Sequence, residues 1–238
     1  MKNNKNIIHI IHNKYFVLLT LVLLFFANNA KNAMAQDSIT KPFTIKAGYL
    51  QTYLRGGDVD FLSIGGETNA LNSFLIGIEY NSEISKYISF KHELNFNING
   101  AEVQLNDAIN GTYHSSLRMN SLQLQPLNVA FRIMGFQLYA GPYASALLNA
   151  SIKRKDADGN TYKDTSIFGK PDEETEENKY LQKIDFGATV GLLYELNKTI
   201  SLGVRYNHGF VPIFDNTTEQ MPIKIYNTSW GVVVGWNL

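Results

Sequence analysis

The chain contains no cysteine, which excludes disulfide bonds and a lipid-modified N-terminal cysteine. Beyond residue 35 it also lacks an apolar run of the roughly 20 residues that a membrane-spanning helix needs. Basic charge is not in surplus, because 21 Lys and Arg stand against 21 Asp and Glu. Since binding a phosphate backbone needs a concentrated basic surface, this composition excludes nucleic acid as a partner.

The first 35 residues predict a cleavable signal peptide. Lysines between Lys2 and Lys14 precede an apolar run from Tyr15 to Ala27, and the small-residue site Ala33-Met34-Ala35 follows. This order is typical of a secretory signal cut after Ala35, whereas the alternative, an anchor helix, would need a longer apolar run. Cleavage would remove four lysines and no acid, leaving 17 basic residues against 21 acidic ones.

The segment from Asn227 to Leu238 alternates strictly between two kinds of side chain. One face carries Trp230, Val232, Val234, Trp236 and Leu238, and the other carries mostly small or polar residues such as Gly231. A period of two indicates a β-strand. Large apolar groups alternating with small or polar ones are typical of a wall between lipid and a narrow lumen.

The same period recurs in about eight segments of barrel-strand length. They are residues 43–54, 73–80, 87–99, 121–132, 136–152, 183–196, 200–208 and 227–238. Short connections at 81–86, 133–135 and 197–199 alternate with long ones at 55–72, 100–120, 153–182 and 209–223. Up-and-down membrane barrels with short periplasmic turns and longer outer loops show this rhythm.

We therefore predict an all-β fold, an eight-stranded up-and-down antiparallel transmembrane β-barrel preceded by a cleavable signal peptide. Residues 1–35 would be the signal peptide, 36–42 a short periplasmic segment, and 43–238 the barrel domain, with both termini periplasmic. In the fourth segment the apolar parity changes at Pro126, which predicts a β-bulge because proline cannot donate to the ladder. His92 is the one interruption of the apolar face of the third segment.

Side-chain volume predicts which face points inward. A soluble barrel alternates too, but an eight-stranded barrel only just accommodates its own side chains, so the aromatic-rich face is too bulky for the interior. The opposite face carries Gly48, Gly77, Gly187, Gly191, Gly203, Gly231 and Gly235. We expect the aromatic face to contact lipid, with an interfacial girdle formed by Tyr80, Tyr87, Tyr194 and Trp236.

This orientation places charged residues inside the barrel. They are Lys46, Glu79, Lys91, Glu93, Asp185, Glu195 and Arg205. Charges removed from water must be paired, and the expected pairs are Lys46 with Glu79, Lys91 with Glu93 or Glu79, and Arg205 with Glu195. Because small barrels are packed, a structural plug is favoured over an ion or proton path.

Four short motifs resemble the PorT-like outer-membrane β-barrel proteins of Bacteroidetes. They are Ile45-Lys46-Ala47-Gly48, Ala140-Gly141-Pro142-Tyr143, Asp185-Phe186-Gly187 and Val204-Arg205-Tyr206-Asn207, in order along most of the mature chain. The resemblance implies an integral outer-membrane barrel inserted by the barrel-assembly machinery. It also makes the last strand, with Trp230, Gly231, Val234, Trp236 and Leu238, an assembly signal, although Leu238 stands where Phe is usual. Some relatives support secretion or gliding.

Two motifs are candidates for a catalytic site and for a calcium site. Arg205-Tyr206-Asn207-His208 is similar to the Arg-Tyr-x-His of outer-membrane lipid A deacylases, but Phe210 stands where their serine nucleophile should be. Asp156-Ala157-Asp158-Gly159-Asn160 resembles the start of a calcium loop, although Gly159 is too early and Ile167 replaces the closing Glu. A hairpin turn explains its Asp-Gly pair equally well.

These observations favour a non-enzymatic outer-membrane barrel without metal or cofactor, whose outer loops or periplasmic rim contact the envelope. Expected partners are outer-membrane lipid and lipopolysaccharide, the barrel-assembly machinery during insertion, and a secretion or envelope protein. The alternatives are a lipid A-modifying barrel enzyme and a small ion-conducting pore.

Overall fold

The computed structural model describes residues 42–169, 181–215 and 222–238. Nine β-strands and two short 3-10 helices occur in these residues: β1 (Phe43–Gly56), η1 (Val59–Phe61), β2 (Leu71–Glu83), β3 (Ile88–Asp107), β4 (Gly111–Ile133), β5 (Phe136–Lys155), β6 (Thr161–Asp164), η2 (Ser166–Phe168), β7 (Ile184–Glu195), β8 (Ile200–Gly209) and β9 (Ile225–Asn237). The predicted signal peptide lies outside the described residues. Within the described ranges, no helix has the length and apolar character to cross a membrane.

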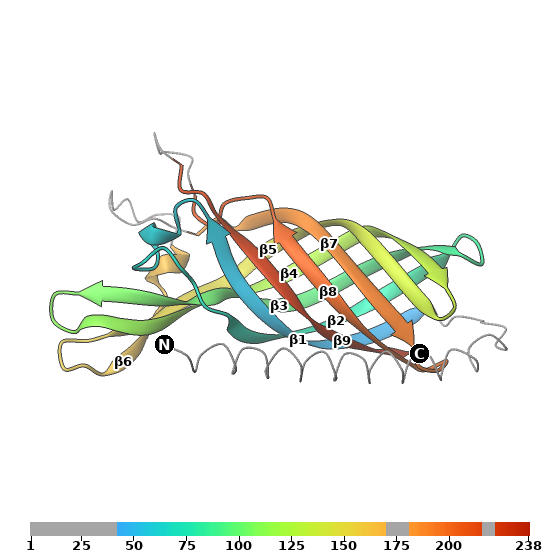
Figure 1. Cartoon of the computed structure of the whole chain (residues 1–238), viewed down its shortest axis with the longest axis horizontal. Helices are drawn as coiled ribbons and strands as arrows, with labels where there is room; N and C mark the ends of the chain where they lie inside the picture. The colour runs from blue at the N-terminus through green and yellow to red at the C-terminus, as the bar shows by residue number, and fades with distance from the viewer. Residues whose placement is uncertain (1–41, 170–180, 216–221) are drawn as a thin grey trace, which may run out of the picture.

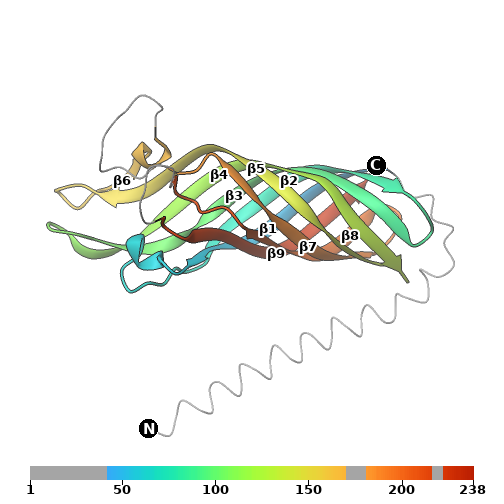
Figure 2. The same cartoon turned by 90° about the horizontal axis from the view of Figure 1, so that it is seen from above.

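Eight strands form a closed ring. Neighbours pair antiparallel in the order β4-β3-β2-β1-β9-β8-β7-β5, and β4 also pairs with β5, which closes the barrel. The last strand β9 pairs with both β1 and β8, so the two ends of the described chain meet in the wall. Figures 1 and 2 show the tilted ring in two views. The predicted eight-stranded up-and-down barrel is confirmed.

The two ends of the barrel differ. One, here called the terminal end, carries the start of β1, the end of β9 and the short connections between β2 and β3, β4 and β5, and β7 and β8. At the other, called the projecting end, the β3–β4 and β5–β6 hairpins extend beyond the ring, as Figure 1 shows.

The predicted long loops are partly wrong. Residues 100–107 and 111–120 do not form a loop but prolong β3 and β4, with Ala101 opposite Leu117 and Val103 opposite Ser115. Within the predicted loop 153–182, β6 adds a short strand that pairs with the end of β5. The alternation of side chains continues through these residues and indicates strands. The extensions were not predicted because the expected strand length was that of a membrane crossing, and these strands are longer.

The bulge at Pro126 is confirmed and also accounts for His92. Lys91 pairs with Asn128 while Glu93 pairs with Gln125, so an additional β4 residue fits between them. His92 Nδ1 lies 2.5 Å from the Pro126 carbonyl oxygen. Because a carbonyl only accepts, Nδ1 donates, and the polar ring is satisfied on an otherwise apolar face.

The apolar face points outward along the ring, as predicted. Phe43, Phe74, Val129 and Trp236 each expose about half of their surface. Tyr80 and Tyr87 are likewise exposed, whereas Tyr194 is only 3% exposed although it has the same parity on β7 as the outward-facing Val190 and Leu192. The ring of Phe136, directly opposite in the β5–β7 register, packs on Tyr194 with centroids 4.7 Å apart.

Inside the ring, glycines on one strand receive large side chains from the next. A Cβ added to Gly187 would lie 2.5 Å from the Tyr143 ring, and one added to Gly191 would overlap the Tyr139 ring. Gly203 and Gly231 leave room for Leu193 and Leu50 in the same way. The glycine face of the sequence is therefore a set of sockets that lets a narrow lumen hold bulky groups.

Candidate functional site: the barrel lumen and its cap

Five charged side chains meet in the lumen and form what we call the lumen network: Lys46, Glu79, Lys91, Glu93 and Arg205. Each is at most 4% exposed. Their positions follow from strand alternation, because each lies on the inward face of its strand.

The sheet register explains why cations gather around these carboxylates. Glu79 of β2 lies directly opposite Glu93 of β3, and like charges in that position repel. Lys46 Nζ bridges the two, contacting Glu79 and lying 2.8 Å from Glu93 Oε1. Lys91 Nζ lies 2.7 Å from Glu79 Oε1. The two lysines thus convert a repulsive pair into a stable cluster.

Arg205 joins the network from the far side of the lumen. It lies on β8 between Gly191 and Gly231 of the neighbouring strands, and its Nη1 is 3.3 Å from Glu93 Oε2 on β3. An ion pair between non-adjacent strands spans the interior, so the charged side chains fill the lumen at this level.

Amide and aromatic side chains complete the cluster. Asn95 and Asn128 donate to Glu93 at 3.1 Å and 3.4 Å, and Gln137 Oε1 accepts from Lys91 at 2.7 Å. The Tyr139 ring centroid lies 5.5 Å from Lys46 Nζ and 5.3 Å from Lys91 Nζ, within cation–π range. These partners were not among the predicted lumen residues, although each lies at inward parity on its strand.

Two predicted members do not belong to the lumen network. Glu195 pairs with Arg132 at 3.2 Å near the terminal end, where Arg132 also contacts Glu83 at 2.9 Å. The expected Arg205–Glu195 pair is therefore wrong. Arg205 lies opposite Gly191, four residues from Glu195 along β7, so the two side chains start about 13 Å apart along the strand.

Asp185 lies nearer the projecting end, where Tyr143 donates to its carboxylate at 3.1 Å. It lines a cavity of about 20 Å³ together with Ser121, Ser145 and Asn227, enough for one water molecule. Met119 and Ile213 also line this cavity, so it borders an apolar region.

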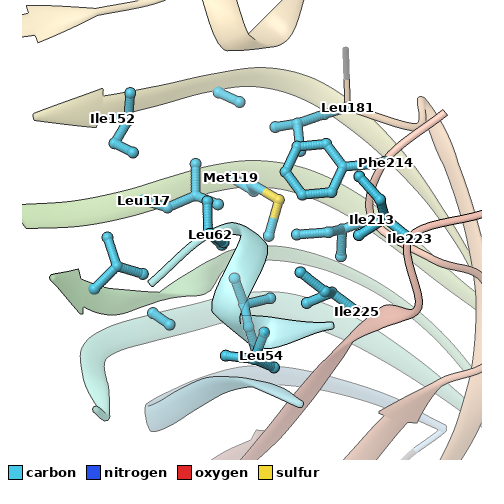
Figure 3. Close-up of a cluster of buried hydrophobic side chains, with 14 residues drawn as sticks. Leu54, Leu62, Leu117, Met119, Ile152, Leu181, Ile213, Phe214, Ile223 and Ile225 are labelled. Carbon is cyan, nitrogen blue, oxygen red and sulfur yellow. The ribbon is translucent and has the colours of Figure 1, made fainter. Parts of the chain in front are cut away.

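That apolar region is a second core, here called the cap. Its fourteen buried residues are Leu54, Val59, Leu62, Ala101, Val103, Leu117, Met119, Ala150, Ile152, Leu181, Ile213, Phe214, Ile223 and Ile225. Figure 3 shows side chains from strands and from loops pointing toward one another over the barrel end. The cap does not follow from strand alternation, because its loop residues are distant in sequence.

Backbone hydrogen bonds hold the loops of the cap in place. Gln182 N donates to Ile213 O at 2.7 Å, and Ile213 N donates to Ile225 O at 2.8 Å. Leu181 forms an isolated bridge with Phe214. The connections after β6 and β8 are thereby tied to the barrel wall.

The two motifs considered for catalysis and for calcium binding make local hydrogen bonds and ring contacts. His208 Nδ1 lies 3.2 Å from the Thr228 hydroxyl, and its ring stacks on Tyr206 on the outward face. Asp156 Oδ1 accepts from the backbone N–H groups of Asp158 and Asn160 at 3.0 Å and 2.8 Å. The hairpin turn that the Asp-Gly pair predicts is present. In the described ranges, no cluster of three or more His, Cys, Asp or Glu could hold a metal ion.

The expected assembly signal lies in β9 and in Leu238, the residue that follows it. Trp230, Val234, Trp236 and Leu238 are each about half exposed on the outer surface, while Gly231 is buried and accommodates Leu50. This placement agrees with a lipid-facing strand that closes the barrel. Recognition by an assembly machinery stays a prediction.

Comparisons with known proteins agree with this architecture. The sequence model of the family described as outer membrane protein beta-barrel domain matches residues 34–215. No curated protein sequence matches the chain significantly.

Solved structures that resemble this chain share little of its sequence. Ail, the attachment invasion locus protein of Yersinia pestis, in complex with the heparin analogue sucrose octasulfate, is 11% identical, with 83% of this chain and 99% of that chain covered and a TM-score of 0.42. Neisserial surface protein A is 11% identical, with 82% and 97% covered and a TM-score of 0.48. OprG of Pseudomonas aeruginosa is 11% identical, with 83% and 95% covered and a TM-score of 0.42.

Proposed function

Because the chain belongs to the family of outer-membrane protein β-barrel domains, we propose that it is a closed, non-enzymatic barrel that presents a rigid surface for envelope or partner contacts. The protein is located in the cell outer membrane. In this proposal the projecting end is extracellular and the terminal end periplasmic. The observation that carries it is the combination of a filled lumen and strands that continue past the ring.

The filled interior supports a structural role over conduction. The lumen network crosses the barrel from β8 to β3, and the cap covers the projecting end with fourteen buried apolar residues. An ion would have to break buried ion pairs and enter an apolar layer, both of which are costly. Sustained conductance of the purified protein in planar bilayers would contradict this part of the proposal.

The surroundings of His208 favour the non-enzymatic alternative over a lipid A deacylase. A general base needs a nucleophile that substrate can reach, but the hydroxyl beside His208 belongs to Thr228, which is buried, and Phe210 packs against the His208 ring. Lipid A profiles of cells with and without His208→Ala test this point. A lost acyl chain that depends on His208 would make the protein an enzyme.

We assign the chain, more finely, to the PorT-like proteins, with the last strand recognised by the barrel-assembly machinery. In support, the four motifs that resemble the PorT-like family contribute side chains to the interior of the barrel. Lys46 and Arg205 both contact Glu93, and Tyr143 of the second motif donates to Asp185 of the third. Gly187 also leaves room for the Tyr143 ring. A secretion or envelope protein is the expected partner of a barrel of this type.

Sidedness and partner contact can be tested in one experiment, because the native chain has no cysteine. Ile109 at the β3–β4 tip is 71% exposed, and Ile84 in a terminal-end turn is 60% exposed. In intact cells, a membrane-impermeant maleimide should label Ile109→Cys and leave Ile84→Cys unlabelled until the outer membrane is permeabilised. The reverse pattern would invert the proposed orientation. Crosslinking from Ile109→Cys would then identify proteins that contact the projecting sheet, by which we mean the β3–β4 and β5–β6 hairpins beyond the ring.

A further inference from the structure

The outward face of the projecting sheet is basic. Leu117 and Ile152 lie opposite each other and point into the cap, so their neighbours along β4 and β5 point outward. Among these neighbours and the β6 residue paired with Lys153, one face carries the cations Arg118, Lys153 and Lys163. Glu102 of β3 is the acidic residue that shares this face among the described strands.

Two of these lysines repel each other. Lys153 and Lys163 are direct partners in the β5–β6 register, and both are exposed. Like charges directly opposite in an antiparallel pair destabilise it. Among the described residues, the ion pair in this hairpin is Arg154 with Asp164 at 2.7 Å, which lies on the other face. The lysine pair is therefore left for an anion from outside the barrel.

The basic face begins where the apolar surface ends. Leu122 on β4 and Leu148 on β5 are 40% and 50% exposed, and Asn120 and Asn149 follow them toward the projecting end. Arg118 lies four residues beyond Leu122, about 13 Å along a tilted strand. This distance reaches out of the hydrocarbon layer and into the headgroup region.

We propose that Arg118, Lys153 and Lys163 form a binding site for the phosphate groups of the outer-leaflet glycolipid headgroup, the phosphorylated lipid A of lipopolysaccharide. The inference rests on the proposed function, because it requires the projecting end to be extracellular. A guanidinium binds phosphate bidentately and ammonium groups bind it as point charges, so the set suits this ligand. The lipid phosphates would also neutralise the lysine pair.

The test compares two matched variants in detergent. Lys153→Gln/Lys163→Gln removes two charges from the basic face, and Lys86→Gln/Lys198→Gln removes two exposed lysines from terminal-end turns. Binding of bis-phosphorylated lipid A to each is measured by thermophoresis. The basic-face variant should bind about thirtyfold more weakly than the native protein, because each lysine near an anionic surface contributes about fivefold. The control variant should bind as the native protein does.

Three outcomes would overturn the proposal. They are unchanged affinity in the basic-face variant, equal loss in both variants, and equal binding of dephosphorylated lipid A. Competition by millimolar inorganic phosphate alone would overturn the lipid assignment as well, because it would show a general anion site. Folding of the variants is checked separately, since relief of repulsion should leave Lys163→Gln at least as heat-resistant as the native protein without lipid. Labelling of Ile109→Cys from outside the cell supports the proposed orientation independently. If that labelling occurs but the basic-face variant binds lipid A as tightly as the native protein, only this inference fails and the proposed function stands.

Discussion

The lumen and the cap are two cores built from the inward faces of the same ring of strands, yet their chemistry is opposite. Ion pairs among Lys46, Glu93 and Arg205 cross the lumen beside a small apolar cluster, whereas the buried cluster of the cap is apolar throughout. The lumen is enclosed by continuous strands whose register places each charge of the lumen network beside an opposite charge. Six of the fourteen cap residues, Leu181 and Ile213 among them, come from connections between strands, for which non-directional apolar burial is sufficient.

The comparison implies that losing a partner in the lumen is costlier than losing volume in the cap. Glu93→Gln removes the carboxylate that serves both Lys46 and Arg205, and should destabilise the barrel by about 3–5 kcal/mol because buried cations lose their partners. Urea unfolding followed by electrophoretic mobility of the folded barrel measures the change. Glu102→Gln, an exposed carboxylate on the same strand, should have little effect. Equal effects of the two substitutions would show that lumen charges contribute no more than surface charges.

In the cap, Leu117→Ala should cost about 2–5 kcal/mol locally, because Leu117 is fully buried and the substitution leaves a void. We expect the loops around Ile213 to exchange amide hydrogens faster and be cleaved more readily, while the barrel stays folded. Leu148→Ala, at a half-exposed position on the outer surface, is the control. Global unfolding of Leu117→Ala at the same urea concentration as Glu93→Gln would mean that the two cores are one cooperative unit.

We expect a methyl group added to a glycine socket beside the lumen network to destabilise the barrel more than one added to an exposed glycine. Gly191→Ala puts a methyl group into the Tyr139 ring, and should cost about 1–3 kcal/mol by overpacking. Tyr139→Leu in the same chain should recover part of this loss by making room. Gly57→Ala, where a Cβ meets nothing within 4 Å, should be neutral. Equal melting temperatures for Gly191→Ala and Gly57→Ala would refute the socket interpretation.

The smallest expected effect is a pH response at the hairpin tip beyond the cap. Backbone N–H donation from Asn110, and also from Ile109, lowers the pKa of Asp107 below its ordinary value. A depressed carboxyl pKa stabilises the turn above the unfolded value of about 4, and this contribution is lost as pH falls through the folded pKa. NMR titration of the Asn110 amide should therefore show a shift only at low pH. In Asp107→Asn this titration should vanish, and its persistence would assign the shift to another group.

Periodicity predicted some features well because they depend on single strands. Alternation assigned Phe74 and Trp236 to the outer face, and the parity change at Pro126 located the bulge. The expected Lys46–Glu79 pair is present, and Lys91 pairs with Glu79, one of its two expected partners. Lys46 lies on β1 directly beside β2, so counting along adjacent strands sufficed for the first pair. Counting along adjacent strands did not predict the partner of Arg205, because Glu93 lies across the lumen.

By itself, the sequence determined the strand period, the side of the wall each residue occupies and the polar character of the interior, since backbone geometry alternates side chains whatever the tertiary context. Only the tertiary structure decided that Arg205 reaches Glu93, that Glu195 pairs with Arg132, and that loops around Leu181 and Ile213 close the barrel as a cap. These contacts join residues far apart in the chain, and they depend on the depth and curvature of a closed ring, which a one-dimensional pattern does not contain.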